Sequence, residues 1–232
     1  MAPDHLDVYI IGAGGFAREV LELIRDINKA RSGCDGGNPT RLGGADDHFN
    51  VVGFLDKDSE NWGRSLNGVK ILGDESLLME CENKFGVALG IGNPRVKRTI
   101  VERLQTIENI CFPNFIHPSV IVGSNNTFGV GNVITAGNII TCNVEVKNHA
   151  MINLACTVGH DCVIDNYVVI SPGVNISGYC QIGEGAYLGT GSSLLENRKI
   201  GDWAIVGGSA LVNKDVPRGV TVVGVPAKPL PV

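Results

Sequence analysis

His160 and Asp161 are adjacent and form the strongest candidate for acid–base chemistry in the sequence. Histidine is the side chain that exchanges a proton most readily near neutral pH, and a nearby carboxylate raises its basicity. His149, the other histidine in this part of the chain, has no carboxylate beside it. A His-Asp pair is also common at polar turns, so its chemistry alone leaves a catalytic and a structural role open.

A repeat of six residues determines where this pair would lie. From residue 122 to residue 212, every sixth residue is aliphatic or phenylalanine. An even period keeps these side chains on one face of each strand. Short strands joined by corners then wrap into a parallel β-helix of about five triangular coils, with the aliphatic side chains filling its axis. The sixteen repeat positions are Val122, Phe128, Ile134, Ile140, Val146, Ile152, Val158, Ile164, Ile170, Ile176, Ile182, Leu188, Leu194, Ile200, Val206 and Val212.

The positions around each repeat residue agree with this interpretation. Corners need positive backbone φ angles, which glycine, asparagine and aspartate tolerate best. One of these types stands three positions after the repeat residue at 125, 131, 137, 143, 161, 173, 185, 191 and 197. Cys156, Cys162 and Cys180 stand two positions before it, where small inward-facing side chains recur. These cysteines are therefore predicted to fill the core and not to bind a metal.

Residues eighteen apart occupy the same corner of successive coils, about 4.8 Å from each other. Cys142, His160, Gly178 and Glu196 are therefore expected to form one column. Gly178 has no side chain, and its backbone N–H is a candidate oxyanion donor to a reacting carbonyl. Asn153, one hexapeptide before His160, either orients a substrate or serves as a turn amide.

The first half of the chain predicts a small α/β unit. Strands are expected at residues 7–11, 51–55, 69–72 and 87–91. Helices are expected at 16–29, at 74–84 with Asp74 as N-cap, and from Pro94 to about Leu104 with Asn93 as N-cap. Residues 31–50 are expected to form a loop. Alternating strands and helices predict a parallel sheet that binds ligands at the carboxyl ends of its strands.

The turn after the first predicted strand, Gly12-Ala13-Gly14-Gly15, fits the loose form of a phosphate-binding loop before a helix. Asp56, at the end of the second strand and followed by Lys57, is placed to accept hydrogen bonds from a base or ribose. About four strands are too few for a full dinucleotide fold, so a mononucleotide or nucleotide sugar is favoured over NAD. A tight strand-to-helix turn and a solvated strand end are the structural alternatives.

Gly92 and Asn93 follow the fourth predicted strand and precede Arg95 and Arg98. The glycine permits close approach of a ligand to the backbone, and either arginine is a candidate to bind phosphate. A basic helix face in water explains the two cations equally well.

Composition excludes several classes of protein. A net charge of -5 argues against sequence-independent nucleic-acid binding. No apolar run approaches the ~18 residues that span a bilayer, and no signal peptide is expected. Seven cysteines without a CxxC pair predict reduced thiols in a cytoplasmic protein with no metal site. Residues 1–118 hold 13 Lys/Arg and 17 Asp/Glu against 6 and 7 afterwards, which predicts two domains, 1–112 and 113–232.

Five segments carry a family resemblance across nearly the whole chain. They are IGAGG at 11–15, GFLD at 53–56, GIGN at 90–93, VGHDCVI at 158–164 and VGVPAK at 223–228. In this order they resemble hexapeptide-repeat acyltransferases of the sialic acid O-acetyltransferase type. Within that group the chain is similar to bacterial N-acetyltransferases of nucleotide-linked 4-amino-4,6-dideoxysugars, of the bacillosamine and perosamine type.

The resemblance implies a Rossmann-like α/β domain followed by a left-handed parallel β-helix, in a homotrimer with active sites between neighbouring β-helices. It implies acetyl-CoA-dependent acetylation of the sugar 4-amino group, with His160 as general base, Asp161 tuning that histidine and Gly178 meeting the thioester carbonyl. Acetyl-CoA would lie beside Pro226, Ala227 and Lys228. The nucleotide sugar would lie against Gly12, Ala13, Gly14, Gly15, Asp56, Lys57, Gly92, Asn93 and Asn153.

The sequence departs from these relatives at two positions on the sugar-nucleotide side. Val169 and Phe16 stand where some of them carry histidines. The nucleotide base, the sugar and the pathway therefore stay open. O-acetylation of a sialic acid or another sugar, and non-catalytic binding of a nucleotide sugar, are the alternative functions. An NAD-linked oxidoreductase is disfavoured because no constellation for hydride transfer is present.

Overall fold

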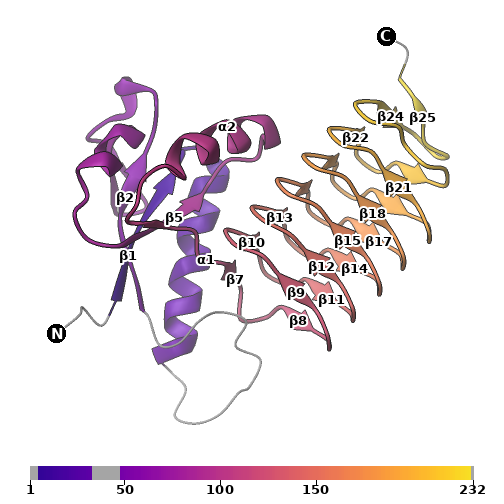
Figure 1. The fold of residues 1–232 in the computed structure, drawn as a ribbon, viewed down its shortest axis with the longest axis horizontal. Helices are drawn as coiled ribbons and strands as arrows, with labels where there is room; N and C mark the ends of the chain where they lie inside the picture. The colour runs from indigo at the N-terminus through magenta and orange to yellow at the C-terminus, as the bar shows by residue number, and fades with distance from the viewer. Residues whose placement is uncertain (1–4, 33–47, 231–232) are drawn as a thin grey trace.

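The computed structural model describes residues 5–32 and 48–230, which form two parts that follow each other in the chain (Figure 1). The first part is a six-stranded sheet with helices, and the second is a stack of short parallel strands. No helix among the described residues is long and apolar enough to cross a membrane.

The sheet of the first part has the order β3-β4-β2-β1-β5-β6. Five of its strands are parallel, and β3 alone pairs antiparallel, with β4. The strand bounds are β1 (His5–Ile11), β2 (His48–Leu55), β3 (Ser65–Leu66), β4 (Val69–Gly73), β5 (Phe85–Leu89) and β6 (Ile110–Cys111). The prediction of about four strands was wrong in number, because β3 and β6 are only two residues long and show no periodicity.

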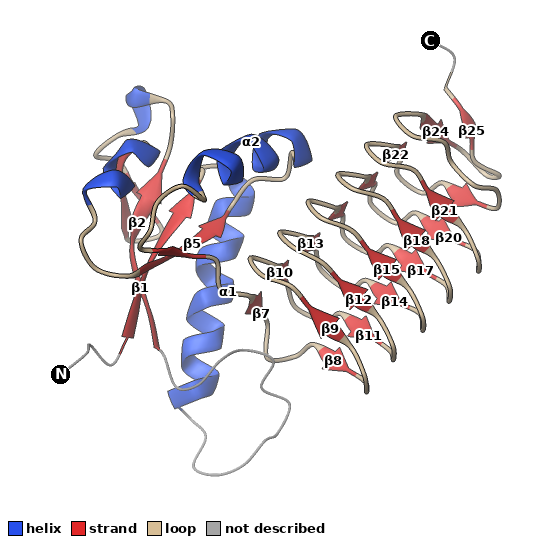
Figure 2. Cartoon of the chain, viewed as in Figure 1, coloured by secondary structure: helices blue, strands red, loops and turns tan. Residues whose placement is uncertain are grey.

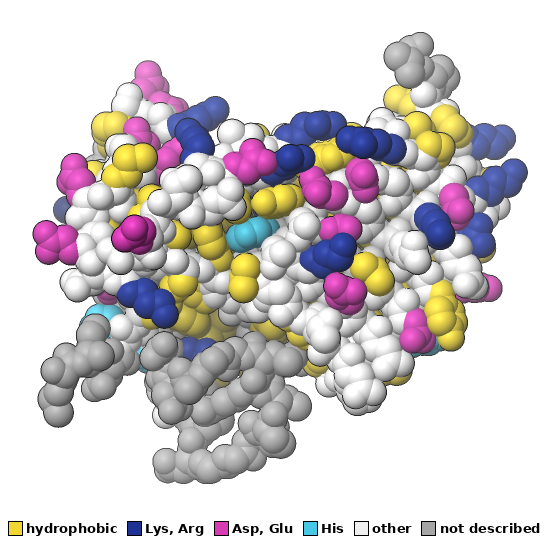
Figure 3. All heavy atoms as spheres, viewed as in Figure 1, with side chains coloured by type: hydrophobic (Ala, Val, Ile, Leu, Met, Phe, Trp, Pro, Cys, Tyr) yellow, Lys and Arg dark blue, Asp and Glu magenta, His cyan; other side chains and the backbone are white. Residues whose placement is uncertain are grey.

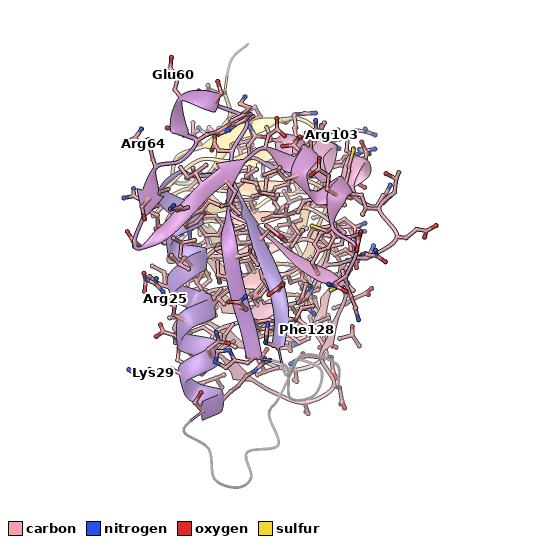
Figure 4. All side chains as sticks on the ribbon, turned by 90° about the vertical axis from the view of Figure 1, so that its left-hand side faces the viewer. Arg25, Lys29, Glu60, Arg64, Arg103 and Phe128 are labelled. Carbon is pink, nitrogen blue, oxygen red and sulfur yellow. The ribbon has the colours of Figure 1, made fainter. Side chains whose placement is uncertain are left out.

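Two α-helices pack against this sheet, α1 (Gly15–Ser32) and α2 (Pro94–Leu104) (Figure 2). Side chains along β1 point alternately to the two faces of the sheet, so the core consists of two clusters. Val8 and Ile10 pack with α1, whereas Ile11 packs with α2. In Figure 4, Arg25 and Lys29 extend from the side of α1 that faces away from the sheet.

Two short 3₁₀ helices, η1 (Ser59–Asn61) and η2 (Glu75–Glu80), complete this part. Asp74 caps η2 as predicted, but the helix expected to reach residue 84 was wrong. Leu78 is its only buried residue, so this segment lacks the apolar face that stabilises a longer α-helix. The loop expected at 31–50 is shorter than predicted, since α1 includes residues 31 and 32 and β2 begins at His48. The remainder of that loop, 33–47, lies outside the described residues.

The second part is a parallel β-helix with three sheets, in which neighbouring strands of a sheet are eighteen residues apart from β7 to β23. At its end, β24 pairs with β22 in a register of sixteen residues, and β25 pairs antiparallel with β24. The repeat residues from Ile134 to Val212 are buried on its axis, and the cysteines predicted to fill the core are buried among them.

The first sheet contains β7 (Phe115–Ile116), β10 (Val133–Ile134), β13 (Met151–Ile152), β16 (Val169–Ile170), β19 (Tyr187–Leu188), β22 (Ile205–Val206), β24 (Thr221–Val223) and β25 (Lys228–Pro229). The second contains β8 (Ile121–Val122), β11 (Ile139–Ile140), β14 (Thr157–Val158), β17 (Asn175–Ile176), β20 (Ser193–Leu194) and β23 (Leu211–Val212). The third contains β9 (Thr127–Phe128), β12 (Glu145–Val146), β15 (Val163–Ile164), β18 (Gln181–Ile182) and β21 (Lys199–Ile200).

The corners of the coils adopt positive φ at all nine positions predicted to do so. The same conformation occurs at six further corners, which the sequence did not predict because their residue types rarely adopt it: His149, Ala155, Tyr167, Tyr179, Trp203 and Ser209. The geometry of the coil therefore sets the corner conformation even where a bulky residue stands there.

The two parts share apolar packing. Phe115 of β7 and Val133 of β10 belong to the same buried cluster as α1. The chain leaves the sheet after β6 and enters the β-helix at β7. A boundary between residues 112 and 113 stays a prediction, because this shared cluster joins the two parts.

Candidate active site

His160 and Asp161 lie at the corner between β14 and β15, and the His160 Nδ1 to Asp161 Oδ2 distance is 2.8 Å. The His160 side chain is 51% exposed, so the ring is open to a substrate. A carboxylate only accepts hydrogen bonds, so the proton of the neutral imidazole lies on Nδ1. The lone pair of Nε2 is then free to accept a proton, which is the arrangement a general base requires.

Gly178 lies directly against the His160 ring in the next coil, as the column of residues eighteen apart predicts. A Cβ atom on Gly178 would lie 2.7 Å from both Cε1 and Nε2 of His160. The Gly178 carbonyl accepts a hydrogen bond from the Asn197 N–H at 3.0 Å, whereas the Gly178 N–H has no acceptor among the described residues. A free backbone N–H beside the imidazole fits the predicted oxyanion donor.

The predicted acetyl-CoA segment lies at the last coil. Lys228 pairs with Val223 across β24 and β25, and the Ala227 N–H donates to the Leu211 carbonyl at 2.8 Å. Strand β24 of this coil is four strand spacings beyond β13, which lies in the coil of His160, or roughly 19 Å along the axis at the usual strand spacing. Contact of Pro226, Ala227 and Lys228 with acetyl-CoA stays a prediction.

The glycine turn joins β1 to α1, as predicted. Gly12 has φ of 100°, and its N–H donates to the Leu55 carbonyl at 2.7 Å. A Cβ on Gly14 would meet nothing within 4 Å, so the turn is open on that side. Asp56 follows β2, and its Oδ1 accepts the Asp58 N–H at 2.9 Å. Each feature can receive a ligand, and each also has the local structural role that the sequence left open.

Gly92 and Asn93 line a pocket of about 530 Å³ with Arg95, Tyr187 and Trp203, and the other lining residues are Pro94, Gly185 and Ile205. Residues of the α/β part and of the β-helix therefore enclose it together. Asn93 Oδ1 caps α2 by accepting the N–H groups of Arg95 and Val96, as predicted.

The structure distinguishes the two arginines that the sequence treated alike. Arg98 is paired with Glu102 at 2.7 Å and with Glu184 at 3.0 Å. The Arg95 guanidinium lies 4.7 Å from the Trp203 ring centroid and has no carboxylate partner within the described part of the chain. In the view of Figure 3, Lys and Arg side chains lie along the upper edge of the molecule, near α2. Arg95 is therefore the arginine available to an anionic ligand.

Asn153 is buried, and its Oδ1 accepts hydrogen bonds from the Leu154 N–H at 2.8 Å and the Thr135 hydroxyl at 3.3 Å. These contacts give it the structural role of a turn amide. A second role toward substrate stays a prediction.

The structure brings His160, Asp161 and Gly178 together but does not join them to the glycine turn within one chain. Among the described residues, the His160 side chain contacts Asp161 and Tyr179 and lies against Gly178, all in the β-helix. In Figure 1 the corners between β11 and β12 and between β14 and β15 lie on the side of the coils opposite the α/β part. The His160 corner and the glycine turn are therefore two separate groups of predicted site residues in one chain, and we refer to them as half-sites.

Two features were missed by sequence reasoning. The first is Tyr179, which contacts the His160 ring. The eighteen-residue spacing placed residue 179 near His160, but its residue type did not suggest a role there. Lys97 on α2 is only 2% exposed and has no side-chain partner within residues 5–32 and 48–230. Burial lowers the pKa of Lys97 to about 7, and burial together with Lys97 lowers the pKa of His149 to about 4.

Replacing Lys97 with methionine is expected to stabilise the protein. A folded pKa of about 7, against 10.5 for the free side chain, means that the folded state resists protonation. Lys97 therefore lowers the free energy of unfolding by on the order of 3–5 kcal/mol. This destabilisation is fully present below pH 7 and disappears as the pH rises toward 10.5. Thermal unfolding at pH 6.5 and pH 10 measures it. A gain in Tm at pH 6.5 that persists undiminished at pH 10 contradicts this explanation.

Comparison with known proteins agrees with the fold and the repeat. Residues 41–104 match the family model of the PglD N-terminal domain. The acetyltransferase domain of PglB from Neisseria gonorrhoeae is 30% identical with a TM-score of 0.80, and the match covers 97% of this chain and 99% of that one. The chain belongs to the hexapeptide-repeat acyltransferases, whose coils form a left-handed parallel β-helix.

Two further relatives are similar over most of their length. GDP-perosamine N-acetyltransferase of Escherichia coli O157:H7 is 28% identical over 226 residues, which are 94% of each chain. PerB of Caulobacter crescentus, solved in complex with CoA and GDP-perosamine, is 27% identical with a TM-score of 0.82 and 97% coverage of both chains. The gonococcal PglB domain was also solved with acetyl coenzyme A.

Proposed function

We propose that this protein transfers the acetyl group of acetyl-CoA to the 4-amino group of a nucleotide-linked 4-amino-4,6-dideoxysugar. The observation that carries the proposal is the corner where His160 is hydrogen-bonded to Asp161 and lies against Gly178, whose N–H has no acceptor among the described residues. Full-length similarity to proteins named as perosamine N-acetyltransferases supports the acceptor class.

Each predicted residue of this corner has a role in the proposed reaction. The sugar amine attacks the thioester carbonyl while Nε2 of His160 accepts a proton from the amine. Asp161 stabilises the imidazolium through Nδ1, and the Gly178 N–H stabilises the oxyanion. Collapse of the tetrahedral intermediate breaks the C–S bond, forms the amide and releases the coenzyme A thiol, which takes up the proton held by His160.

Binding of the nucleotide is assigned to the carboxyl edge of the sheet, where the Gly12–Gly15 turn, Asp56 and Gly92 follow successive parallel strands. Of free UDP, dTDP and GDP, the nucleotide with the acceptor's base should bind there most tightly and inhibit acetyl transfer competitively against the acceptor. Calorimetric titration with each nucleotide measures this and identifies the base. Turnover with free sialic acid that no nucleotide inhibits would instead support a sugar O-acetyltransferase.

Replacing Arg95 with alanine is expected to weaken binding of the nucleotide diphosphate about tenfold. The reason is that its guanidinium has no carboxylate partner among the described residues and lines the pocket beside Gly92. The matched control is Arg98→Ala, whose guanidinium is occupied by Glu102 and Glu184 and which should bind as the wild type does. Equal losses in the two variants would mean that general surface charge, and not an Arg95 contact, attracts the nucleotide.

The two half-sites within one chain support a homotrimer in which His160 faces the nucleotide site of a neighbouring copy. Apolar side chains exposed on the coils, including Ile121, Val130 and Ile139, are suited to be buried between copies. Seven cysteines without a CxxC pair fit a reducing compartment, so we place the reaction in the cytoplasm.

Mixing two inactive variants should restore activity if the site lies between copies. His160→Ala removes the base, and Gly14→Asp adds a carboxylate to the open turn without steric conflict. A mixed oligomer then contains a site whose two halves are both intact. Co-refolded chains are assayed for coenzyme A release against each variant alone. Two variants that stay as inactive together as apart, while forming mixed oligomers by native mass spectrometry, argue for a site within one chain.

A further inference from the structure

Tyr179 has an unfavourable backbone conformation for its residue type. Its φ is 60°, in the left-handed region that bulky side chains rarely adopt. The other members of its corner column are short polar residues suited to that conformation: Asn125, Asn143, Asp161 and Asn197. A tyrosine therefore replaces the expected asparagine at one coil only, next to the candidate base.

The other aromatic side chains at left-handed corners pack against a partner. Tyr167 stacks on His149 with ring centroids 5.5 Å apart, and Trp203 lies beneath Arg95. Both contacts are close to α2, where the two parts of the protein meet. Tyr179 lies at a different corner and is 54% exposed, so core packing does not explain it.

The partner of Tyr179 is the imidazole of His160. The two ring centroids are 5.0 Å apart with an interplanar angle of 89°, which is the favourable edge-to-face arrangement. The Tyr179 N–H also donates to the His160 carbonyl at 2.9 Å. Asp161 fixes one nitrogen of the exposed imidazole, but a single hydrogen bond still allows the ring to swing.

We propose that Tyr179 is a positioning residue that restricts the His160 ring to the orientation in which Nε2 faces the acceptor amine. This inference rests on the proposed function, since the orientation matters only if His160 accepts a proton. Asp161 and Tyr179 then hold the ring from two directions, and Gly178 leaves the space that the ring occupies. Because the contact uses the ring and not the hydroxyl, phenylalanine can replace tyrosine.

Tyr179→Asn and Tyr179→Phe test this role. Asparagine suits the left-handed corner, so the first variant should fold and keep or raise Tm. We expect its kcat to fall about three- to tenfold with little change in the KM for acetyl-CoA, whereas the phenylalanine variant keeps most of kcat. Ser209→Asn, at a left-handed corner on a different column, is the control for the backbone change alone.

A spectroscopic readout separates positioning from general damage. The aromatic ring shifts the His160 imidazole proton resonances, and this shift should be lost in Tyr179→Asn but kept in Tyr179→Phe. Wild-type kcat in the asparagine variant, or His160 resonances that do not respond to it, overturns the proposal. The resonances can be recorded without substrate, so absence of acetyl transfer in the wild type would count against the proposed function and not against the ring contact.

Discussion

His160→Ala is expected to lower kcat/KM for acetyl transfer by ~10²–10⁴-fold, the usual contribution of a positioned general base. The physical reason is that no other described group within reach of this corner combines a free nitrogen lone pair with a bonded carboxylate partner. The loss should appear in kcat, since the imidazole acts on the proton transferred during the reaction. Steady-state kinetics with acetyl-CoA and the amino-sugar acceptor measure it.

The variant should fold as the wild type does. The His160 side chain is half exposed and outside the apolar axis of the β-helix, so its removal leaves no buried cavity. Tm and oligomeric state are therefore expected to be unchanged, and they serve as the control. Activity equal to that of the wild type in a folded His160→Ala protein would remove the histidine from the mechanism.

Gly178→Ala is expected to reduce activity nearly as strongly, although it deletes no functional group. The added Cβ would lie 2.7 Å from both Cε1 and Nε2 of His160, closer than real Cβ atoms approach a neighbour. The imidazole is the movable partner, because its ring is at the end of a half-exposed side chain. The ring should swing toward solvent and lose its bond to Asp161, with little cost in Tm.

A double-mutant cycle distinguishes displacement of the ring from damage to the oxyanion donor. If Gly178→Ala acts by moving His160, it should have little further effect in a His160→Ala background. If it also disturbs the free N–H of Gly178, a second loss should remain there. A wild-type rate in Gly178→Ala would show that the ring does not occupy the position described during catalysis.

The β-helix could be predicted because its structure repeats with a fixed number of residues along the sequence. A period of six over sixteen repeat residues determines strand, face and register together, and the eighteen-residue column placed Gly178 beside His160. The nine corners with glycine, asparagine or aspartate were confirmed for the same reason. The left-handed backbone conformation of Tyr179 could not be predicted, since the coil imposes a conformation that tyrosine disfavours.

The α/β part was harder to predict where tertiary contacts override local pattern. The two-residue strands β3 and β6 exist only through pairing with β4 and β5. Lys97 stands on a helix whose sequence suggests a solvated basic face, yet it is buried and has no side-chain partner in the part of the chain that the structure describes. The position of the half-sites on opposite sides of the coils was also hidden, because it depends on how the two parts pack.

The most direct test of the central claim is coenzyme A release from acetyl-CoA with a panel of acceptors. The panel contains UDP-, dTDP- and GDP-linked 4-amino-4,6-dideoxyhexoses together with free sialic acid, and mass spectrometry of the product locates the acetyl group. We predict rapid thiol release with one nucleotide-linked amino sugar and an acetamide at its C4 position. Turnover with sialic acid alone, or no release with any acceptor, would contradict the proposed function.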